Sequence, residues 1–471
     1  MWFKNAIFYQ IYPLGFCNVP KQNSRDYSNS WNNACAPLDS NNSENIRKVC
    51  NWIPHLQKLQ INAVYFSPLF QSDSHGYDTR DYYTIDSRLG SNDDFAFVCN
   101  ELHSHGIRVV VDGVFNHVGR GFWAFRDVLK NRENSLYKDW FFIDWNRDSV
   151  WKDSQGRGDG FFTEGWEGHY DLVKLNLRNP AVVDHLFGAI KKWIELFHID
   201  GIRLDVAYCL DDNFLQQLRS FTESLPGEKL VLIGEILFGD YNTKVNDKML
   251  HSCTNYECYK GLWSSCNDNN LFEIAYAFNR QQGVAENHNN QIGIYAGKSL
   301  FSFVDNHDVS RLASTVTKKE YLAIIYGMLF SMHGTPCLYY GSEWGILGDK
   351  KGGDHGLRPC LSHPEWNELT DFIAKLSYLH SVKKALYEGT YTQLMITNSQ
   401  LIFMRKIDNE KPIVVAINIS DSEYWAVPNN SAYGAFSGLS GNWKNLITGE
   451  IESLSGSLCL ASKSILFIEE Q

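Results

Sequence analysis

The chain has 471 residues and a formal charge of −11, from 43 Lys and Arg against 54 Asp and Glu. Apolar residues make up 44 % and aromatic residues 14 % of the sequence. This composition is typical of a globular protein with a large core and excludes a disordered chain. The acidic balance, without any run of Lys or Arg, argues against a nucleic-acid partner.

The sequence contains no apolar stretch near the ~20 residues that span a bilayer, so we expect no membrane association. The N-terminal segment lacks the features of a signal peptide. Eleven scattered cysteines without a CxxC pair predict reduced thiols and no disulfide or zinc framework. Together these features predict a cytoplasmic protein.

Seven segments are predicted to be β-strands, because they are rich in Val, Ile, Leu, Phe and Tyr without clean polar alternation. Such runs are typical of strands buried on both faces, as in a parallel sheet. In chain order they are AIFYQIYP (6–13), AVYFSPL (63–69), RVVVDGVF (108–115), GIRLDVA (201–207), KLVLIGEIL (229–237), SLFSFVDNH (299–307) and TPCLYYG (335–341).

Two of the connecting segments have the apolar spacing of helices. One begins at Asn92 and ends before Gly106. The other begins at Pro180 and repeats apolar residues every three or four positions as far as Phe197. Strand–helix alternation of this kind predicts a parallel α/β architecture.

An eighth strand, predicted near residues 256–263, completes the number that closes a (β/α)8 TIM barrel. An aromatic-rich segment interrupts the alternation after the third strand, and short alternating runs near the C-terminus predict antiparallel β-structure. We therefore predict a barrel from residues 1–117 and 171–384, an inserted domain at 118–170 and a C-terminal β-sandwich domain at 385–471.

Acidic residues stand at or just past the C-terminal ends of four predicted strands: Asp112, Asp205, Glu235 and Asp308. In a barrel these strand ends converge on one face, where active sites are built. A buried carboxylate costs several kcal/mol unless it is paired or hydrogen-bonded. Independent strand-end caps explain any one of these residues but not the set of four.

Polar neighbours strengthen this interpretation. Arg203 lies two residues before Asp205 on the same strand face, where its guanidinium would keep the carboxylate ionised. His117 and His307 also follow strands and could donate hydrogen bonds to a polyhydroxylated ligand. Cleavage of a glycosidic bond needs two carboxyls in unequal environments, one ionised and one with a raised pKa. Some of the many Trp and Tyr residues would suit sugar rings, although most are expected in the core.

Four segments resemble, in order, the sequence signatures of the α-amylase family, glycoside hydrolase family 13. They are DGVFNH (112–117), GIRLDVA (201–207), GEI (234–236) and FVDNHD (303–308). HGYDTRDY (75–82) and GTPCLYYGSE (334–343) resemble the flanking segments of the family. The resemblance covers nearly the whole chain and implies a (β/α)8 catalytic barrel, with residues 118–170 as the inserted domain B.

The resemblance also implies a role for each matching residue. Asp205 resembles the catalytic nucleophile, Glu235 the general acid/base and Asp308 the third carboxylate, which holds sugar hydroxyls. Asp112 resembles a structural support. The family mechanism is a double displacement that retains the α configuration and needs the two carboxyls ~5–5.5 Å apart. The residues that resemble the substrate-binding set are Tyr77, His117, Arg203, His307, Asp354 and Arg358.

Residues 121–141 and LVKLN (172–176) are similar to neopullulanases, cyclomaltodextrinases and maltogenic amylases. Those enzymes usually carry an N-terminal β domain that helps them dimerise. Because this sequence starts at the first barrel strand, we expect that domain, and dimerisation through it, to be absent. Tyr208 and Cys209 replace the Lys-His pair of many endo-acting members, which favours short maltooligosaccharides as substrates.

The mechanism that the resemblance implies requires no cofactor. Asn116 matches a residue that often binds calcium in the family. The segment 172–176 lacks the aspartate that many calcium-binding members have there, and Ca²⁺ needs six to eight oxygen ligands. The sequence therefore leaves calcium open, with Asn116 as the candidate ligand.

The leading hypothesis is a hydrolase of α-1,4-glucosidic bonds in maltooligosaccharides, cyclodextrins or related α-glucans, with α-1,6 bonds as a further candidate. A transglycosylase would use the same residues and pass the glycosyl group to a sugar. A non-catalytic carbohydrate-binding protein on the same fold is a third hypothesis. The three carboxylates and Arg203 disfavour it, and the oligomeric state stays open.

Overall fold

The computed structural model describes residues 1–23, 45–284, 292–431 and 434–471. Its centre is a sheet of eight parallel strands whose neighbours follow the order β13, β12, β11, β5, β2, β1, β15, β14. A parallel bridge between Thr254 and Phe301 joins the two end strands, and Asn255 N donates to Phe301 O at 2.8 Å. The sheet is therefore closed into the predicted (β/α)8 barrel. The strands are β1 (Phe8–Ile11), β2 (Ala63–Phe66), β5 (Arg108–Gly113), β11 (Gly201–Leu204), β12 (Val231–Gly234), β13 (Ser252–Cys253), β14 (Phe301–Phe303) and β15 (Thr335–Tyr339).

The barrel strands are buried on both faces, as their continuous apolar runs predict. Along β1, Phe8 packs inside the barrel, whereas Tyr9 packs in the outer core against the helices. Along β5, Val110 is inside and Val109 outside. This alternation determines which side chains reach the mouth of the barrel.

The two predicted helices are confirmed. Helix α3 (Asn92–Ser104) is capped by Ser91, whose side chain accepts from Asp94 N. Helix α5 (Pro180–Phe197) follows Asn179, whose side chain accepts from Ala181 N at 2.9 Å. The other helices of the barrel are α1 (Pro13–Phe16), α2 (Ile53–Lys58), α6 (Asp212–Ser224), α7 (Tyr256–Asn267), α8 (Leu271–Gln282), α9 (Leu312–Thr315), α10 (Tyr321–Ser331), α11 (Glu368–Val382) and α12 (Lys384–Glu388).

The strand predicted near residues 256–263 is wrong, because this segment forms the start of helix α7. Its buried residues Cys258, Leu262 and Cys266 recur every four positions, which is a helical period. The sixth barrel strand is instead β13, only two residues long. So short a strand leaves no apolar run that a sequence pattern could identify.

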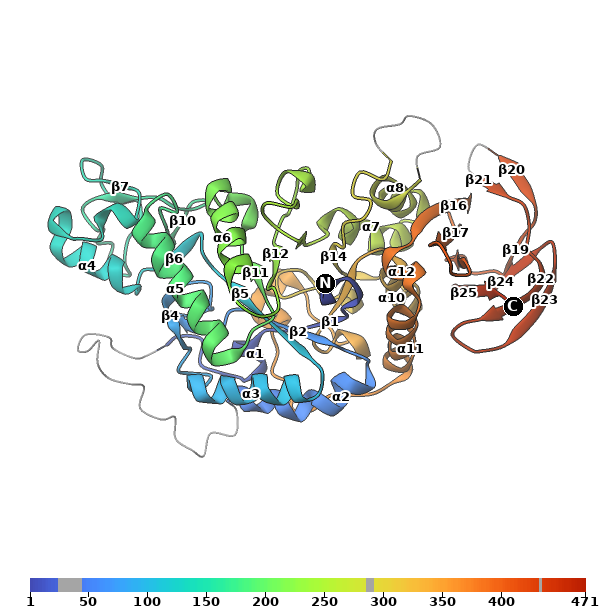
Figure 1. Cartoon of the computed structure of the whole chain (residues 1–471), viewed down its shortest axis with the longest axis horizontal. Coiled ribbons are helices and arrows are strands. Elements are labelled where there is room, and N and C mark those ends of the chain that lie inside the picture. Colours follow the sequence, from blue (N-terminus) through green and yellow to red (C-terminus); the bar gives the residue numbers. More distant parts are fainter. Residues whose placement is uncertain (24–44, 285–291, 432–433) are drawn as a thin grey trace.

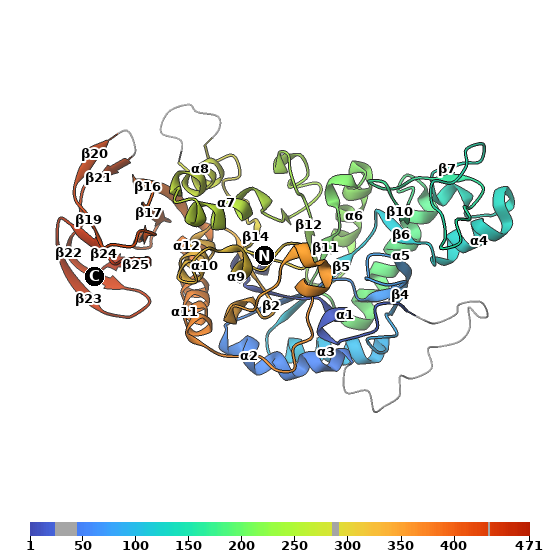
Figure 2. The same ribbon diagram turned by 180° about the vertical axis from the view of Figure 1, so that it is seen from behind.

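The segment after the third barrel strand forms a separate lobe between β6 (His117–Gly119) and β10 (His169–Lys174), which pair antiparallel. A hairpin of β3 (Phe70–Ser72) and β4 (Thr79–Ile85) precedes it in the chain. Figures 1 and 2 show this lobe and the C-terminal strands at opposite ends of the molecule. The lobe also contains α4 (Trp123–Asn131), β7 (Ile143–Asp144), β8 (Phe162–Thr163) and β9 (Gly165–Trp166).

The C-terminal region is antiparallel, as predicted. One face of its main sheet packs into the barrel core through Phe403 and Phe467. The other face forms a separate hydrophobic core that contains Ile402 and Ile468. Six strands form this sheet, in the order β16 (Thr390–Ile396), β17 (Gln400–Lys406), β18 (Ile413–Asn418), β25 (Ser464–Glu470), β22 (Ser440–Asn445) and β23 (Ile451–Ser455). The smaller pairs are β19 (Tyr424–Ala426) with β24 (Leu458–Leu460), and β20 (Asn429–Ser431) with β21 (Gly434–Phe436).

A close contact between α10 and β25 yields a test of how this sheet docks on the barrel. A methyl group on Gly327 would lie 2.6 Å from Ile465 Cδ1 and 2.9 Å from its Cγ2. We expect Gly327→Ala to destabilise the protein by about 1–3 kcal/mol, which outweighs a gain of up to ~1 kcal/mol in helix propensity. Thermal denaturation of the variant would show a lowered Tm. The decrease in Tm caused by Gly327→Ala should be smaller in a protein that also carries Ile465→Ala. An unchanged Tm of the single variant would contradict the contact.

Candidate active site

The interior of the barrel changes from apolar to polar at the C-terminal ends of its strands. Because side chains alternate along a strand, Gln10 shares the inward face of β1 with Phe8, and Asp112 shares that of β5 with Val110. Arg203 comes from the neighbouring strand β11, where it is paired in register with Asp112. Three polar side chains thus cover the apolar core of the barrel at one end.

Arg203 forms ion pairs with three carboxyl groups. Its Nη1 lies 2.9 Å from Asp112 Oδ1 and 2.9 Å from Asp205 Oδ1, and its Nη2 lies 2.8 Å from Glu235 Oε1. Val206 N donates to Glu235 Oε2 at 3.0 Å. The predicted contact between Arg203 and Asp205 is therefore confirmed, and one guanidinium joins Asp205 to Glu235.

The charges in this cluster do not balance, because one buried guanidinium faces three buried carboxyl groups. Burial raises the pKa of Asp205, and Glu235 and Asp112 raise it further against the opposing effect of Arg203. Burial also raises the pKa of Glu235, again opposed by Arg203. A site of this kind retains a proton on one of its carboxyls to a higher pH than exposed carboxyls do.

Asp308 lies in a different electrostatic environment. Its Oδ2 is 3.0 Å from His307 Nε2, and its Oδ1 is 2.9 Å from Arg358 Nη2. Burial would raise the pKa of Asp308, but His307 and Arg358 together hold it below its usual range. The side chain of Asp308 is 36 % exposed, against 7 % for Asp205 and 8 % for Glu235.

Tyr77 and Asp354 complete the group around Asp308. The Tyr77 ring stacks on His307 with 5.7 Å between centroids and 8° between planes. Its hydroxyl bonds to His307 Nε2 and donates to Asp112 Oδ2 at 3.4 Å. Asp354 Oδ2 lies 3.1 Å from Arg358 Nη2, so this ion pair extends the cluster outward.

His117 also lies close to Asp205, with its Nε2 3.9 Å from Asp205 Oδ2. Burial lowers the pKa of His117 to about 3, so the ring is neutral at physiological pH. Within the described residues its buried Nε2 has no hydrogen-bond partner. That nitrogen is therefore available to a ligand that enters the site.

Asn116 lies opposite the C-terminal end of β10. Its Nδ2 lies 3.2 Å from His117 Nδ1, and its backbone carbonyl oxygen accepts from Leu175 N at 3.0 Å. The facing segment contributes Leu172, Val173 and Leu175 with Lys174, none of which offers a side-chain oxygen. Among the residues that the structure describes, no group of three or more His, Cys, Asp and Glu side chains is arranged to hold a metal. Ca²⁺ needs six to eight oxygen ligands, and residues 172–175 supply none from their side chains.

Three further residues of the site were not among the predicted ones. They are Gln10, Tyr65 and Tyr12. Gln10 Nε2 lies 2.7 Å from His307 Nδ1, and Tyr65 donates to Asp112 Oδ2 at 2.8 Å. The ring of Tyr12 lies under the guanidinium of Arg358. Gln10 and Tyr65 stand inside the predicted strands 6–13 and 63–69, and only the shorter observed strands β1 and β2 put them next to a strand end. The strand-end argument used for the carboxylates could therefore not have found them without the observed bounds.

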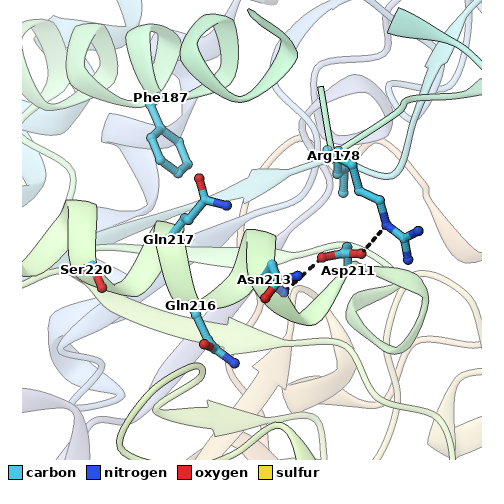
Figure 3. A pocket seen from close by; sticks show the side chains of 8 residues that line it. Arg178, Phe187, Asp211, Asn213, Gln216, Gln217 and Ser220 are labelled. Atoms are coloured by element: carbon cyan, nitrogen blue, oxygen red, sulfur yellow. Dashed lines mark hydrogen bonds and ion pairs between the residues drawn. The ribbon is translucent and has the colours of Figure 1, made fainter. Parts of the chain in front are cut away.

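Two sizeable cavities lie outside this cluster. One of about 980 Å³ is next to the β3–β4 hairpin and is lined by His75, Asp78, Arg120 and Trp151 among others. The other, of about 780 Å³, lies between α5 and α6 and includes the ion pair of Arg178 with Asp211 (Figure 3). None of the predicted site residues lines either cavity.

A (β/α)8 barrel that carries paired carboxyls around an arginine at its C-terminal face has the architecture of a glycoside hydrolase. The family model described as the α-amylase catalytic domain matches residues 10–371. The chain therefore belongs to the α-amylase family of glycoside hydrolases, in agreement with its sequence signatures.

The relatives within the family are of the predicted group. A cyclomaltodextrinase of a Bacillus species is 34 % identical over 444 residues, which cover 88 % of this chain and 73 % of that protein. A maltogenic α-amylase of Bacillus acidopullulyticus is 31 % identical over 434 residues, 89 % of this chain and 70 % of that one. A solved structure of a cyclomaltodextrinase superposes with a TM-score of 0.79 at 29 % identity, covering 100 % of this chain and 78 % of the other.

No helix in the described parts of the chain has both the length and the apolar character needed to cross a bilayer.

The charge imbalance around Arg203 predicts a pH-dependent effect of its removal. We expect Arg203→Gln to destabilise the protein by about 3–5 kcal/mol, because it leaves buried carboxyls without a cation. Without the guanidinium the folded-state pKa values of Asp205 and Glu235 rise further above their unfolded values, so stability is lost as the pH rises. Thermal denaturation at pH 5, 6.5 and 8 should show a growing difference from the wild type. Arg203→Lys, which keeps one positive charge, should lose less, and a pH-independent loss would contradict the charge argument.

Proposed function

We propose that the protein is a retaining glycoside hydrolase that cleaves α-1,4-glucosidic bonds in short α-glucans such as maltooligosaccharides and cyclodextrins. The observation that carries this proposal is the attachment of Asp205 and Glu235 to the two nitrogens of one guanidinium. Two carboxyls held this closely fit the ~5–5.5 Å spacing of retaining enzymes better than the wider gap of inverting ones.

In the first step Asp205 attacks the anomeric carbon, while Glu235 donates its proton to the oxygen of the leaving sugar. Burial raises the pKa of both Asp205 and Glu235, so the pair retains a proton, which the proposed mechanism places on Glu235. Asp205, in its ionised form, is paired with Arg203. In the second step Glu235 takes a proton from water, whose oxygen displaces Asp205 from the sugar and restores the α configuration.

The remaining residues are proposed to bind the sugar that is attacked. Tyr77 offers a half-buried aromatic face next to His307, and His117 offers its unpartnered Nε2. Asp308 is ionised and partly exposed, as a carboxylate that holds sugar hydroxyls should be. Arg358 fixes Asp308 and links it to Asp354 further out. Asp112 supports Arg203 from behind.

The names of the relatives support the substrate class. The cyclomaltodextrinase and the maltogenic α-amylase are named for a cyclic maltodextrin and for maltose, and each matches most of this chain. Both names are consistent with short α-1,4-linked glucans. We propose α-1,6 bonds as a secondary target, to be decided by the substrates tested.

A transglycosylase is the second candidate function, because the same covalent intermediate is resolved by a sugar hydroxyl instead of water. A non-catalytic carbohydrate-binding protein is the third, and the arrangement of Arg203 with Asp205 and Glu235 speaks against it. A protein that only binds sugar gains nothing from two buried carboxyls with raised pKa values.

We propose that the reaction runs without a cofactor, because side chains of this chain supply its nucleophile, its acid and its charge compensation. Residues 172–175, opposite Asn116, carry no side-chain oxygen, which supports a reaction without calcium. Buried free thiols such as Cys99, Cys253 and Cys258 support a reducing compartment, which we propose to be the cytoplasm. The proposed partner is the α-glucan substrate.

Asp205→Asn tests the proposed nucleophile. We expect kcat on maltotriose to fall by about 10⁴-fold or more, since the asparagine amide cannot form the covalent intermediate. Binding of maltotriose, measured by calorimetry, should persist because the sugar contacts remain. Asp171→Asn, a carboxyl outside the site, is the matched control.

The wild type in this assay is also offered maltose, cyclodextrin, pullulan, starch and sucrose, with products identified over time. Activity on pullulan with α-1,6 cleavage would establish the secondary target. Equal and negligible turnover by the wild type and Asp205→Asn on every substrate would favour the carbohydrate-binding alternative instead.

Retention has a direct signature in the first product formed. We expect proton NMR during early turnover of maltotriose to show the α anomer before mutarotation, because two successive inversions at the anomeric carbon restore its configuration. An initial β anomer would overturn the double displacement and assign a base role to Asp205.

A further inference from the structure

Arg358 stands in an irregular segment, although the proposed binding of a sugar depends on where its guanidinium lies. Residues 340–367, all of which the structure describes, form only short 3₁₀ turns between β15 and α11: η7 (Ser342–Trp344), η8 (Lys350–Gly352) and η9 (Asp354–Leu357). Arg358 Nη2 nevertheless lies 2.9 Å from Asp308 Oδ1, and its Nε donates to His307 O at 3.1 Å. Contacts from outside the segment must therefore hold Arg358 in place.

Two tyrosines at the end of β15 fix the backbone on both sides of Arg358. The hydroxyl of Tyr340 donates to Pro359 O at 2.7 Å. The hydroxyl of Tyr339 donates to Leu357 O at 2.9 Å. Both tyrosines are fully buried. Because the core fixes their rings, the two hydroxyls are rigid supports for the carbonyl groups that they contact.

A buried arginine supplies a further contact to the same segment. Arg311 Nη2 donates to Leu357 O at 3.0 Å, and its Nη1 donates to Tyr340 O at 2.6 Å. Arg311 is fully buried, so its side chain has little freedom to move. One guanidinium thus joins the turn before Arg358 to the end of β15.

Helix α1 contacts the backbone of Arg358 directly. A methyl group on Gly15 would collide with Arg358 O and would lie 2.9 Å from the carbonyl carbon, so glycine is required here. Tyr12, the residue before α1, accepts from Arg358 Nη1 at 3.3 Å, and its ring lies under the guanidinium. α1 and β15 therefore restrict both the backbone and the side chain of Arg358.

The position of Arg358 affects the charge and the direction of the Asp308 carboxylate. His307 and Arg358 hold the pKa of Asp308 below its usual range, although burial opposes them. The attraction between two charges falls with distance, so a displaced guanidinium would compensate this carboxylate less. Arg358 Nη2 also bonds to one of the two carboxylate oxygens and so orients the group. A shift of Arg358 would therefore weaken the contacts between Asp308 and a bound sugar.

We propose that Tyr339, Tyr340 and Arg311 are positioning residues, which place Arg358 against Asp308 and thereby set the affinity for the sugar under attack. This role rests on the proposed function and specifies how that sugar is held. The two tyrosines belong to the segment GTPCLYYGSE (334–343), to which the mechanism above assigns no role. None of the three side chains contacts the sugar in this proposal, because each acts through a backbone carbonyl next to Arg358.

Tyr340→Phe tests this role, because it removes one hydroxyl and keeps the buried ring. We expect the Kd for maltotriose, measured by calorimetry in the Asp205→Asn protein, to rise about three- to tenfold, the effect of one lost hydrogen bond. With the nucleophile intact, the KM for maltotriose should rise by the same factor, and kcat should stay within about twofold of the wild type. This split is expected when the lost contact is made equally before and in the transition state.

Gly15→Ala displaces the backbone of Arg358 by a different route and should raise the Kd in the same way. In a protein that also carries Arg358→Ala, either substitution should change the Kd by less than about twofold, because no guanidinium is left to position. This double-mutant cycle separates a role through Arg358 from a general loosening of the fold, which would persist in the Arg358→Ala protein.

Tyr326→Phe is the matched control. Tyr326 on α10 is also fully buried, and its hydroxyl donates to another backbone carbonyl after β15, that of Ser342 at 3.1 Å. This carbonyl does not flank Arg358. Thermal denaturation should show a lowered Tm for both Tyr326→Phe and Tyr340→Phe, whereas only Tyr340→Phe should change the Kd.

The results distinguish the positioning role from the proposed function. An unchanged Kd in both Tyr340→Phe and Gly15→Ala, an equal rise in Tyr326→Phe, or an undiminished rise in the Arg358→Ala protein overturns the positioning role and leaves the proposed hydrolase intact. A wild type that neither binds nor cleaves maltotriose overturns both. A wild type that binds maltotriose without turnover overturns only the hydrolase, and the Kd values then decide the positioning role.

Discussion

A single guanidinium among three buried carboxyl groups is the interaction on which this site depends. The strand order β12, β11, β5 explains how it arises, because Arg203 sits on the middle strand of the three. Asp112 is its register partner on β5, and Glu235 follows β12 directly after the residues that pair with β11. Burying three carboxyl groups costs free energy of hydration. Arg203 offsets part of this cost, because each of its two terminal nitrogens lies within ion-pair distance of a carboxyl oxygen. The ends of the barrel strands therefore set the positions of Asp205 and Glu235 together.

The carboxyl groups of the site differ in the positive charge that surrounds them, and their pKa values shift in different directions as a result. Asp308 faces His307 and Arg358 by itself, so its pKa is held low and it remains an anion. Asp205 and Glu235 share one cation with Asp112, so the cluster retains a proton more readily. Asp308 therefore stays an anion while the neighbouring pair retains a proton, and side chains of this chain provide this difference without any metal in the proposed steps.

The sequence was sufficient to locate seven of the eight barrel strands and the carboxyls of the site, because strand periodicity is local and places every second residue on one face. It was insufficient where a feature depends on contacts distant in the chain. The two-residue strand β13 exists only through pairing with β12 and the bridge beside it, so no pattern marks it. Asp305 lies in the same predicted strand as His307, yet its carboxylate accepts from Leu312 N and the Ser342 hydroxyl, away from the cluster. An acid near a strand end is therefore assigned to catalysis or to structure only by its partners.

The residues around the site divide between barrel strands and the segments that follow them. Arg203 and its three carboxyls stand on or next to barrel strands, whose registers are fixed by the core on both faces. Tyr208 and Glu167, by contrast, stand in a turn after β11 and in the inserted lobe, where they are hydrogen-bonded to each other. Such segments tolerate substitution with little cost to the core. Substitutions in them can therefore change the surroundings of the site while Arg203 and its carboxyls stay unchanged.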